Sequence, residues 1–143
     1  ILNFYGKLYE LDRVTRDKRI AKALELVGLS RRKDSKLKEF SKGMLQRVGI
    51  ASLLLNDGEL FFLDEPTYGL DPLATKEMRN IILSLKKRGK TIFLNTHQIS
   101  EVHKICDRVG ILHEGRLIRE LPVSKIKGSL EEYFVKTVKS YGK

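Results

Sequence analysis

The sequence predicts an α/β fold in which helices cover a small parallel sheet. Two short apolar runs, at 60–63 and 91–94, predict strands buried on both faces, because strands covered on both sides are continuously apolar. Between them, 73–88 carries apolar residues at helical spacing and is followed by Gly89, a residue that commonly ends helices. A strand, a helix and a second strand in this order predict a right-handed parallel unit.

Further helices are predicted before this unit. Apolar spacing predicts a helix over 16–27 that Gly28 ends. Ser41 is placed to cap another helix that reaches about residue 55. That helix is apolar on most sides, so we expect it to be buried. Residues 1–10 are apolar and aromatic, and their pattern fits either a helix or a strand.

The region after the second strand predicts a smaller set of elements. A helix is expected over 99–106, and strands over 108–112 and 116–121 should form a hairpin around a Glu-Gly turn. The tail from residue 124 has a helical pattern. These elements predict three parts of the chain, which are a helical subdomain over 1–57, a sheet-containing part over 58–123 and a helical tail over 124–143.

Composition limits the classes of function. The chain has 143 residues, of which 41% are hydrophobic and 32% charged, so a packed domain is expected rather than a disordered segment. No apolar run approaches the roughly 20 residues that span a bilayer. The net charge of +10 suits nucleic acid, anionic lipid or a phosphate ligand. The basic clusters lack the interleaved aromatic residues of a base-stacking surface, so we interpret them as solvated surface.

The segment 41–43, Ser-Lys-Gly, opens the second long predicted helix. A helix N-terminus offers unsatisfied N–H groups and a partial positive charge, which suit a phosphate group. Gly43 would let the backbone approach such a ligand closely, and Lys42 adds a positive charge at the same place. The alternative interpretation is a plain helix cap.

Polar residues also follow both predicted strands. Asp64 and Glu65 come directly after the first, at the end where open α/β sheets bind their ligands. One carboxylate there could hold Mg²⁺ and the other could orient or deprotonate an attacking water. His97 follows the second strand and could contact a phosphate or that water. The alternatives are a strand end that meets solvent and a structural histidine.

Together with the segment 68–72, Tyr-Gly-Leu-Asp-Pro, these residues resemble the second half of an ABC-type ATPase. The likeness covers the signature motif, the Walker B motif with its catalytic glutamate, the D-loop and the H-loop. The separations between Ser41 and Asp64 and between Glu65 and His97 are similar to those of the family. The resemblance implies part of a RecA-like P-loop NTPase core joined to the ABC helical subdomain.

The resemblance also implies ATP and Mg²⁺ as cofactors, with catalytic roles for three residues. Asp64 would help to hold Mg²⁺, and Glu65 would polarise the attacking water. His97 would sense and stabilise the γ-phosphate.

Four further residues would act between two ATPase subunits. Ser41, Lys42 and Gly43 would contact the γ-phosphate of ATP bound to the opposite subunit. Asp71 would lie at the dimer interface and communicate between the two sites.

The signature motif departs from the usual Leu-Ser-Gly-Gly-Gln, since residues 40–44 read Phe-Ser-Lys-Gly-Met. The serine and the second glycine remain, whereas a contact by the glutamine side chain is lost. The Ser-Lys-Gly-Met form resembles export-type members, the drug- and antibiotic-efflux group, and so does the segment 129–134.

No Walker A loop is found in the sequence. The Gly-Lys-Thr at 89–91 has Ser84 where a P-loop needs its first glycine, and it leads from a helix into a strand. We therefore expect a C-terminal portion that needs an N-terminal half with Walker A as its partner. Alone, it should bind MgATP poorly, fail to hydrolyse it, and expose apolar surface and unpaired strand edges that favour dimerisation or aggregation.

The function implied by the resemblance is ATP hydrolysis that drives transport across a membrane. The implied partners are a second ABC ATPase subunit and transmembrane permease subunits, and the implied location is the cytoplasmic face of the cell membrane. One alternative is an ABC-type ATPase that acts on nucleic acid, but no heptad arm or zinc cysteines point to it, and we do not expect a nucleic-acid partner. The other is a non-catalytic module that donates only its signature motif.

Overall fold

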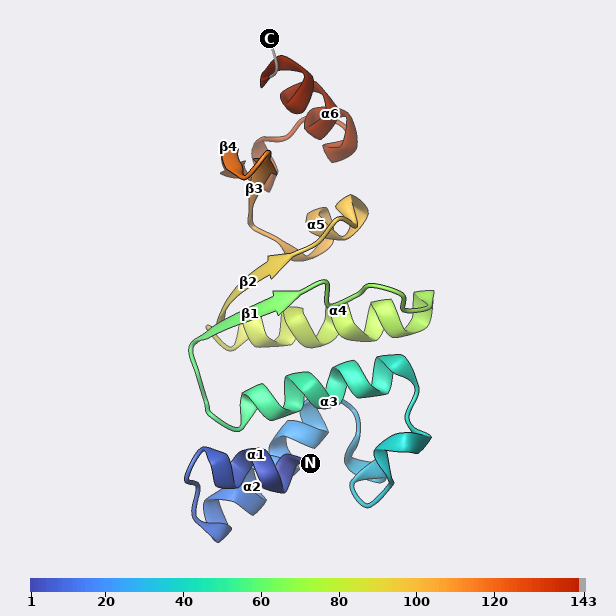
Figure 1. Ribbon diagram of the computed structural model, residues 1–143, viewed down its shortest axis with the longest axis vertical. Helices are drawn as coiled ribbons and strands as arrows, with labels where there is room; N and C mark the ends of the chain where they lie inside the picture. Colours follow the sequence, from blue (N-terminus) through green and yellow to red (C-terminus); the bar gives the residue numbers. More distant parts are fainter. Residues whose placement is uncertain (142–143) are drawn as a thin grey trace. The chain divides into compact units, whose positions relative to one another are not determined.

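The computed structural model describes residues 1–141, which form two compact units, one over Ile1–Asn95 and a second that begins at Thr96. The first unit contains, in order, α1 (Leu2–Leu8), α2 (Arg13–Leu26), α3 (Lys42–Leu54), β1 (Leu60–Asp64), α4 (Pro72–Lys87) and β2 (Thr91–Asn95) (Figure 1). The second contains α5 (Ile99–Ile105), β3 (Arg108–His113), β4 (Arg116–Pro122) and α6 (Leu130–Tyr141). The predicted division at residues 57 and 123 concerns subdomains and stays a prediction.

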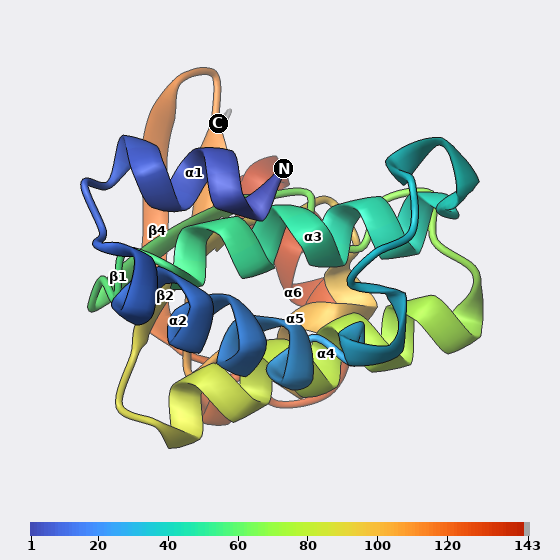
Figure 2. The same cartoon turned by 90° about the horizontal axis from the view of Figure 1, so that it is seen from below.

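Three helices form one side of the first unit. The undecided segment 1–10 is helical as α1, and both α1 and α2 pack against α3 (Figure 2). The side chain of Asp12 caps α2 by accepting hydrogen bonds from the N–H groups of Val14 and Thr15 at 2.9 and 3.1 Å. Gly28 ends this helix as predicted, with a φ of 68° in the left-handed region that glycine adopts without steric cost.

The predicted strand, helix and strand are present as a parallel unit. β1 and β2 pair in parallel with a register that runs from Leu60 opposite Thr91 to Asp64 opposite Asn95. α4 packs against β2 on one side and α3 on the other, so it lies between the sheet and the helical layer of this unit (Figure 1). Its buried face consists of Met78, Ile81, Ile82 and Leu85.

The prediction that both strands are buried on both faces is wrong for the described residues. Phe61 and Leu63 are buried, but Leu60 and Phe62 are 51% and 69% exposed, and Phe93 of β2 is 62% exposed. The rings of Phe62 and Phe93 pack on each other, with centroids 5.6 Å apart, on the face that no helix of this unit covers. The expectation of exposed apolar surface is therefore confirmed.

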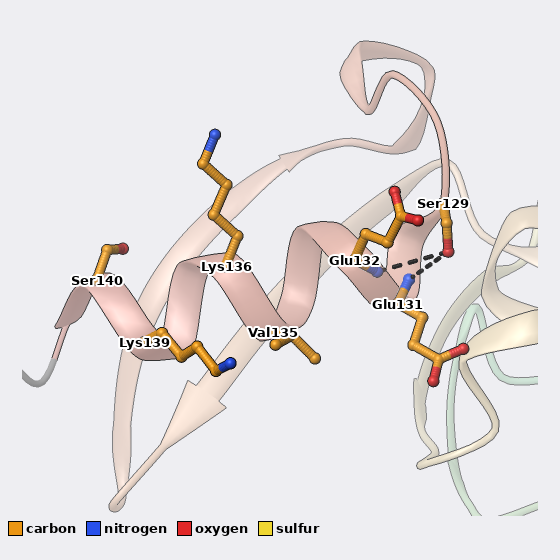
Figure 3. Close-up of a pocket in the computed structure, with 7 residues that line it drawn as sticks. All are labelled: Ser129, Glu131, Glu132, Val135, Lys136, Lys139 and Ser140. Atoms are coloured by element: carbon orange, nitrogen blue, oxygen red, sulfur yellow. Dashed lines mark hydrogen bonds between the residues drawn. The ribbon is translucent and has the colours of Figure 1, made fainter.

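The second unit has its own small core. Val102, Val123, Ile126 and Leu130 are buried together, where α5 and β4 each contact α6. The predicted hairpin is present, with β3 antiparallel to β4. The hydroxyl of Ser129 accepts hydrogen bonds from the backbone N–H groups of residues 131 and 132, at 3.2 and 3.5 Å, and so opens α6 (Figure 3). No helix within residues 1–141 combines the length and apolar character needed to cross a bilayer.

Candidate nucleotide site

Asp64 and Asn95 lie side by side at the carboxyl ends of β1 and β2. The Nδ2 atom of Asn95 donates a hydrogen bond to Oδ1 of Asp64 at 2.8 Å, which fixes the orientation of that carboxylate. The backbone N–H of Glu65 donates to the carbonyl of Asn95 at 2.9 Å, so the parallel pairing continues one residue beyond β1. Asn95 was not among the predicted site residues, although the parallel register places it directly opposite Asp64.

Glu65 has an unusual backbone conformation. Its φ of 45° lies in the left-handed region, which costs an L-residue with a side chain roughly 1–2 kcal/mol. The carbonyl of Glu65 accepts a hydrogen bond from the N–H of Tyr68 at 3.1 Å, and Thr67 within this turn is only 2% exposed. Residues held in such conformations by their surroundings concentrate at functional sites. The geometry therefore marks Glu65 more specifically than its place after a strand does.

The acidic edge suits a metal that is shared with a ligand. The described residues contain no group of three or more His, Cys, Asp or Glu side chains that could enclose a metal ion. Mg²⁺ in nucleotide sites keeps several waters and takes one or two carboxylates together with phosphate oxygens. Asp64, exposed and oriented by Asn95, fits the part of a single carboxylate in such a site.

The start of α3 is capped as predicted. The hydroxyl of Ser41 accepts a hydrogen bond from the N–H of Met44 at 3.3 Å. Gly43 is buried, and a Cβ atom there would lie 3.1 Å from the Cβ of Ala74 and 3.5 Å from Cδ2 of Leu70. Glycine thus allows the close approach of α3 to the start of α4, a packing reason that local sequence patterns do not reveal.

Two basic residues of α3 reach α4 or the loop before it. Lys42 places its ammonium 5.0 Å from the ring centroid of Tyr68. One turn later, Arg47 forms an ion pair with Glu77 of α4 at 3.4 Å and donates to the carbonyl of Val27 at 3.3 Å. These two contacts hold α3 to α4 and to the end of α2. Loop 66–71 and the beginning of α3 are therefore packed against each other within the first unit.

Asp71 has a structural partner in the chain. Its Oδ1 accepts a hydrogen bond from the N–H of Ala74 at 2.9 Å and caps α4. The interface role inferred from the resemblance stays a prediction, and any such role would have to be compatible with this cap.

Replacing Asp71 with alanine should lower the free energy of unfolding by about 1 kcal/mol, because the N–H groups at the start of α4 lose their acceptor. Replacing it with asparagine should cost only a few tenths of that amount, since asparagine caps helices as well as aspartate does. Urea unfolding of both variants measures the difference. Equal losses in the two variants would contradict a capping role.

His97 belongs to the second unit. It lies between β2 and α5, and its carbonyl accepts a hydrogen bond from the N–H of Ile99 at 3.0 Å. Its role toward a phosphate stays a prediction.

The interpretation of residues 89–91 as a helix end and a strand start is confirmed. Gly89 follows α4 with a φ of 78°, and β2 begins at Thr91. The ammonium of Lys90 lies 3.2 Å from Oδ1 of Asp57, where its hydrogen bond lowers the pKa of that carboxyl. This lysine is thus engaged at the opposite end of β1 from Asp64 and Glu65.

Comparison with known proteins decides the family. A family model described as ABC transporter matches residues 3–68. An uncharacterized ABC transporter ATP-binding protein of Synechocystis is 46% identical over 94% of this chain. The chain belongs to the ABC transporter ATP-binding family. It spans 38% of the length of that relative.

Other ABC proteins share the likeness. The bacitracin transport ATP-binding protein BcrA of Bacillus licheniformis is 48% identical over 80% of this chain, which covers 38% of BcrA. A solved structure described as an ATP-binding subunit of an ABC transporter superposes with a TM-score of 0.78 and 32% identity, over 96% of this chain and 60% of that one. The fold is thus the α/β fold of ABC ATPases, and the resemblance to export-type members agrees with relatives such as BcrA.

Proposed function

We propose that the protein containing this chain is the ATP-hydrolysing subunit of an ABC transporter. The observation that carries the proposal is the strained turn at Glu65, which follows the oriented carboxylate of Asp64 at the carboxyl end of β1. The same turn leads into loop 66–71, which packs against the start of α3. Two elements suited to phosphate chemistry are therefore joined by one ordered loop.

The acidic edge would serve the ATP bound by its own subunit. Asp64, oriented by Asn95, would hold Mg²⁺ through water or directly, and the metal would neutralise the charge of the phosphates. Glu65 would accept a hydrogen bond from the attacking water and polarise it. His97 would contact the γ-phosphate.

The start of α3 would serve the ATP bound by a second ABC ATPase subunit. The N–H groups of 42–44, the Lys42 ammonium and the Ser41 hydroxyl would meet its γ-phosphate, since a helix N-terminus favours anions. Asp71 would act at the subunit interface through the loop that it fixes by capping α4.

The other components of the transporter would be supplied by further chain segments and subunits. Walker A donors would be supplied by an N-terminal half that these residues do not include. Closure of two ATPase subunits around ATP would drive transmembrane permease subunits, and binding to those permeases would place the protein at the cytoplasmic face of the membrane.

The proposed cargo is an antibiotic or a similar toxic compound moved out of the cell. Support comes from relatives named for bacitracin transport, linearmycin resistance, fluoroquinolone export and lantibiotic transport. These relatives are 38–48% identical to this chain over the regions that match.

A nucleotide titration tests the proposal. The full protein should bind a fluorescent ATP analogue in the presence of Mg²⁺ and release it when the metal is chelated. The 143-residue chain alone should show negligible binding up to millimolar nucleotide, because it lacks Walker A. Failure of the full protein to bind would overturn the proposal, and tight Mg²⁺-dependent binding by the chain alone would show phosphate donors within these residues that we have not identified.

A resistance assay tests the cargo. Expression of the full protein with its permease in a sensitive host should raise the tolerated concentration of at least one compound among bacitracin, a lantibiotic and a fluoroquinolone. The Glu65→Gln variant should remove that protection. Unchanged sensitivity to all three compounds would contradict export of this cargo class.

A further inference from the structure

The ammonium of Lys42 occupies a defined place. Its Nζ lies 5.0 Å from the centroid of the Tyr68 ring, within the range of a cation–π interaction. A Cβ atom at Gly69 would collide with the same Nζ. The ammonium thus lies beside the ring of Tyr68, in space that is open because Gly69 has no side chain.

The start of α3, which carries Lys42, and loop 66–71, which carries Tyr68, are fixed relative to each other. Gly43, next to Lys42, lies close to Leu70 of the loop and Ala74 of α4, and a Cβ atom at this position would approach the Cβ of Ala74 to 3.1 Å. One turn along α3, Arg47 is paired with Glu77 of α4 at 3.4 Å. The Cα atom of Lys42 therefore has a fixed position relative to loop 66–71.

The position of Lys42 is electrostatically unusual. It is the first residue of α3, where the helix dipole is positive and a cation is disfavoured. The basic side chain is therefore not placed there to stabilise the helix. The negative face of the Tyr68 ring offsets part of this repulsion, and an anion at the helix N-terminus would offset more.

We propose that Tyr68 is a positioning residue that holds the Lys42 ammonium beside the N-terminus of α3, ready for the phosphate of ATP. The inference rests on the proposed ATP-driven function and assigns a further residue to it. Lys42 has a long side chain that loses conformational entropy when it is fixed. Packing against the ring of Tyr68 restricts the Lys42 side chain before ATP binds, so less conformational entropy is lost when the ammonium contacts the phosphate. Tyr68 itself touches no reacting atom.

The test compares ATPase kinetics of variants of the full protein assembled with its permease. Replacing Tyr68 with leucine removes the ring face and should raise the KM for ATP about twofold to fivefold, the change that an exposed cation–π interaction corresponds to. The kcat should change by less than that, because the chemistry at Glu65 is untouched. Tyr68→Phe keeps the ring face and should restore the wild-type KM. Tyr141→Leu, at an exposed tyrosine of the second unit, should leave the KM unchanged.

A double variant separates positioning from general packing. In a Lys42→Met background there is no ammonium to position, so Tyr68→Leu should no longer raise the KM. An equal rise in both backgrounds would overturn the inference, as would an unchanged KM in Tyr68→Leu itself.

Failure of the proposed function gives a different result. A wild-type protein that hydrolyses no ATP, or whose rate is not lowered by Glu65→Gln, would overturn the function and this inference with it. A rate that depends on Glu65 but does not respond to Tyr68→Leu would overturn the inference alone.

Discussion

Replacing Glu65 with glutamine should lower the kcat for ATP hydrolysis by the full protein by about 100-fold to 10,000-fold, the contribution typical of a positioned general base. Glutamine keeps the length and shape of the side chain but cannot accept a proton from water. Because the N–H of residue 65 would still bond to the carbonyl of Asn95, the loop should keep its conformation. The KM for ATP should therefore change by only a few fold, and phosphate release in a steady-state assay measures both values.

A matched control is available on the same segment. Glu59 is an exposed acidic residue directly before β1, so Glu59→Gln makes the same chemical change away from the carboxyl edge. It should leave kcat and KM unaltered. A Glu65→Gln variant with a rate within about threefold of the wild type would exclude Glu65 as the base, since the loss expected for a base is at least about 100-fold.

The second large effect is expected in the core. Ile82 of α4 is 0% exposed, and its replacement by alanine should lower the free energy of unfolding by about 2–5 kcal/mol, because the cavity adds to the lost apolar burial. Ile82→Val, which removes one methylene, should cost only about 0.5–1.5 kcal/mol. Urea or thermal unfolding of the full protein measures these losses.

Function should decline together with stability in the Ile82→Ala variant. α4 carries both the cap at Asp71 and the ion pair between Glu77 and Arg47, so its loosening would release the start of α3. Leu73→Ala, on an exposed position of the same helix, provides the control and should change the free energy of unfolding by no more than about 0.5 kcal/mol. A loss below about 1 kcal/mol for Ile82→Ala would show that the position can collapse around the smaller residue.

The helices were predictable because their signals are local. Apolar spacing of 3.6 residues and capping residues such as Ser41 and Gly28 act within one or two turns. These signals located α2, α3 and α4 to within a few residues of their bounds. The burial of β1 was not predictable in the same way, because its apolar run does not say which elements cover each face. The sequence therefore does not reveal that Phe62 and Phe93 are exposed.

In the candidate site, too, the features with a local sequence signal were predictable and those that depend on tertiary packing were not. Asp64 and Glu65 could be found because acidic residues after an apolar strand have a known place at the carboxyl edge of a parallel sheet. The left-handed backbone of Glu65 has no such signal, since glutamate is not a residue that favours it. The contacts of Lys42 with Tyr68 and of Gly43 with Ala74 join residues far apart in the chain. Only the packing of α3 on α4 brings them together.

The parallel pairing of β1 and β2 has a consequence for the order of events in folding. The register of Leu60 with Thr91 closes a loop that contains all of α4, and pairing across such a distance must wait for loop closure, whereas helices form within about a microsecond. We expect α1–α3 to acquire structure first and the bond between Asn95 and Asp64 to form late. The carboxyl edge of the sheet, which carries Asp64 and Glu65, would then be the last part of this unit to fold during synthesis.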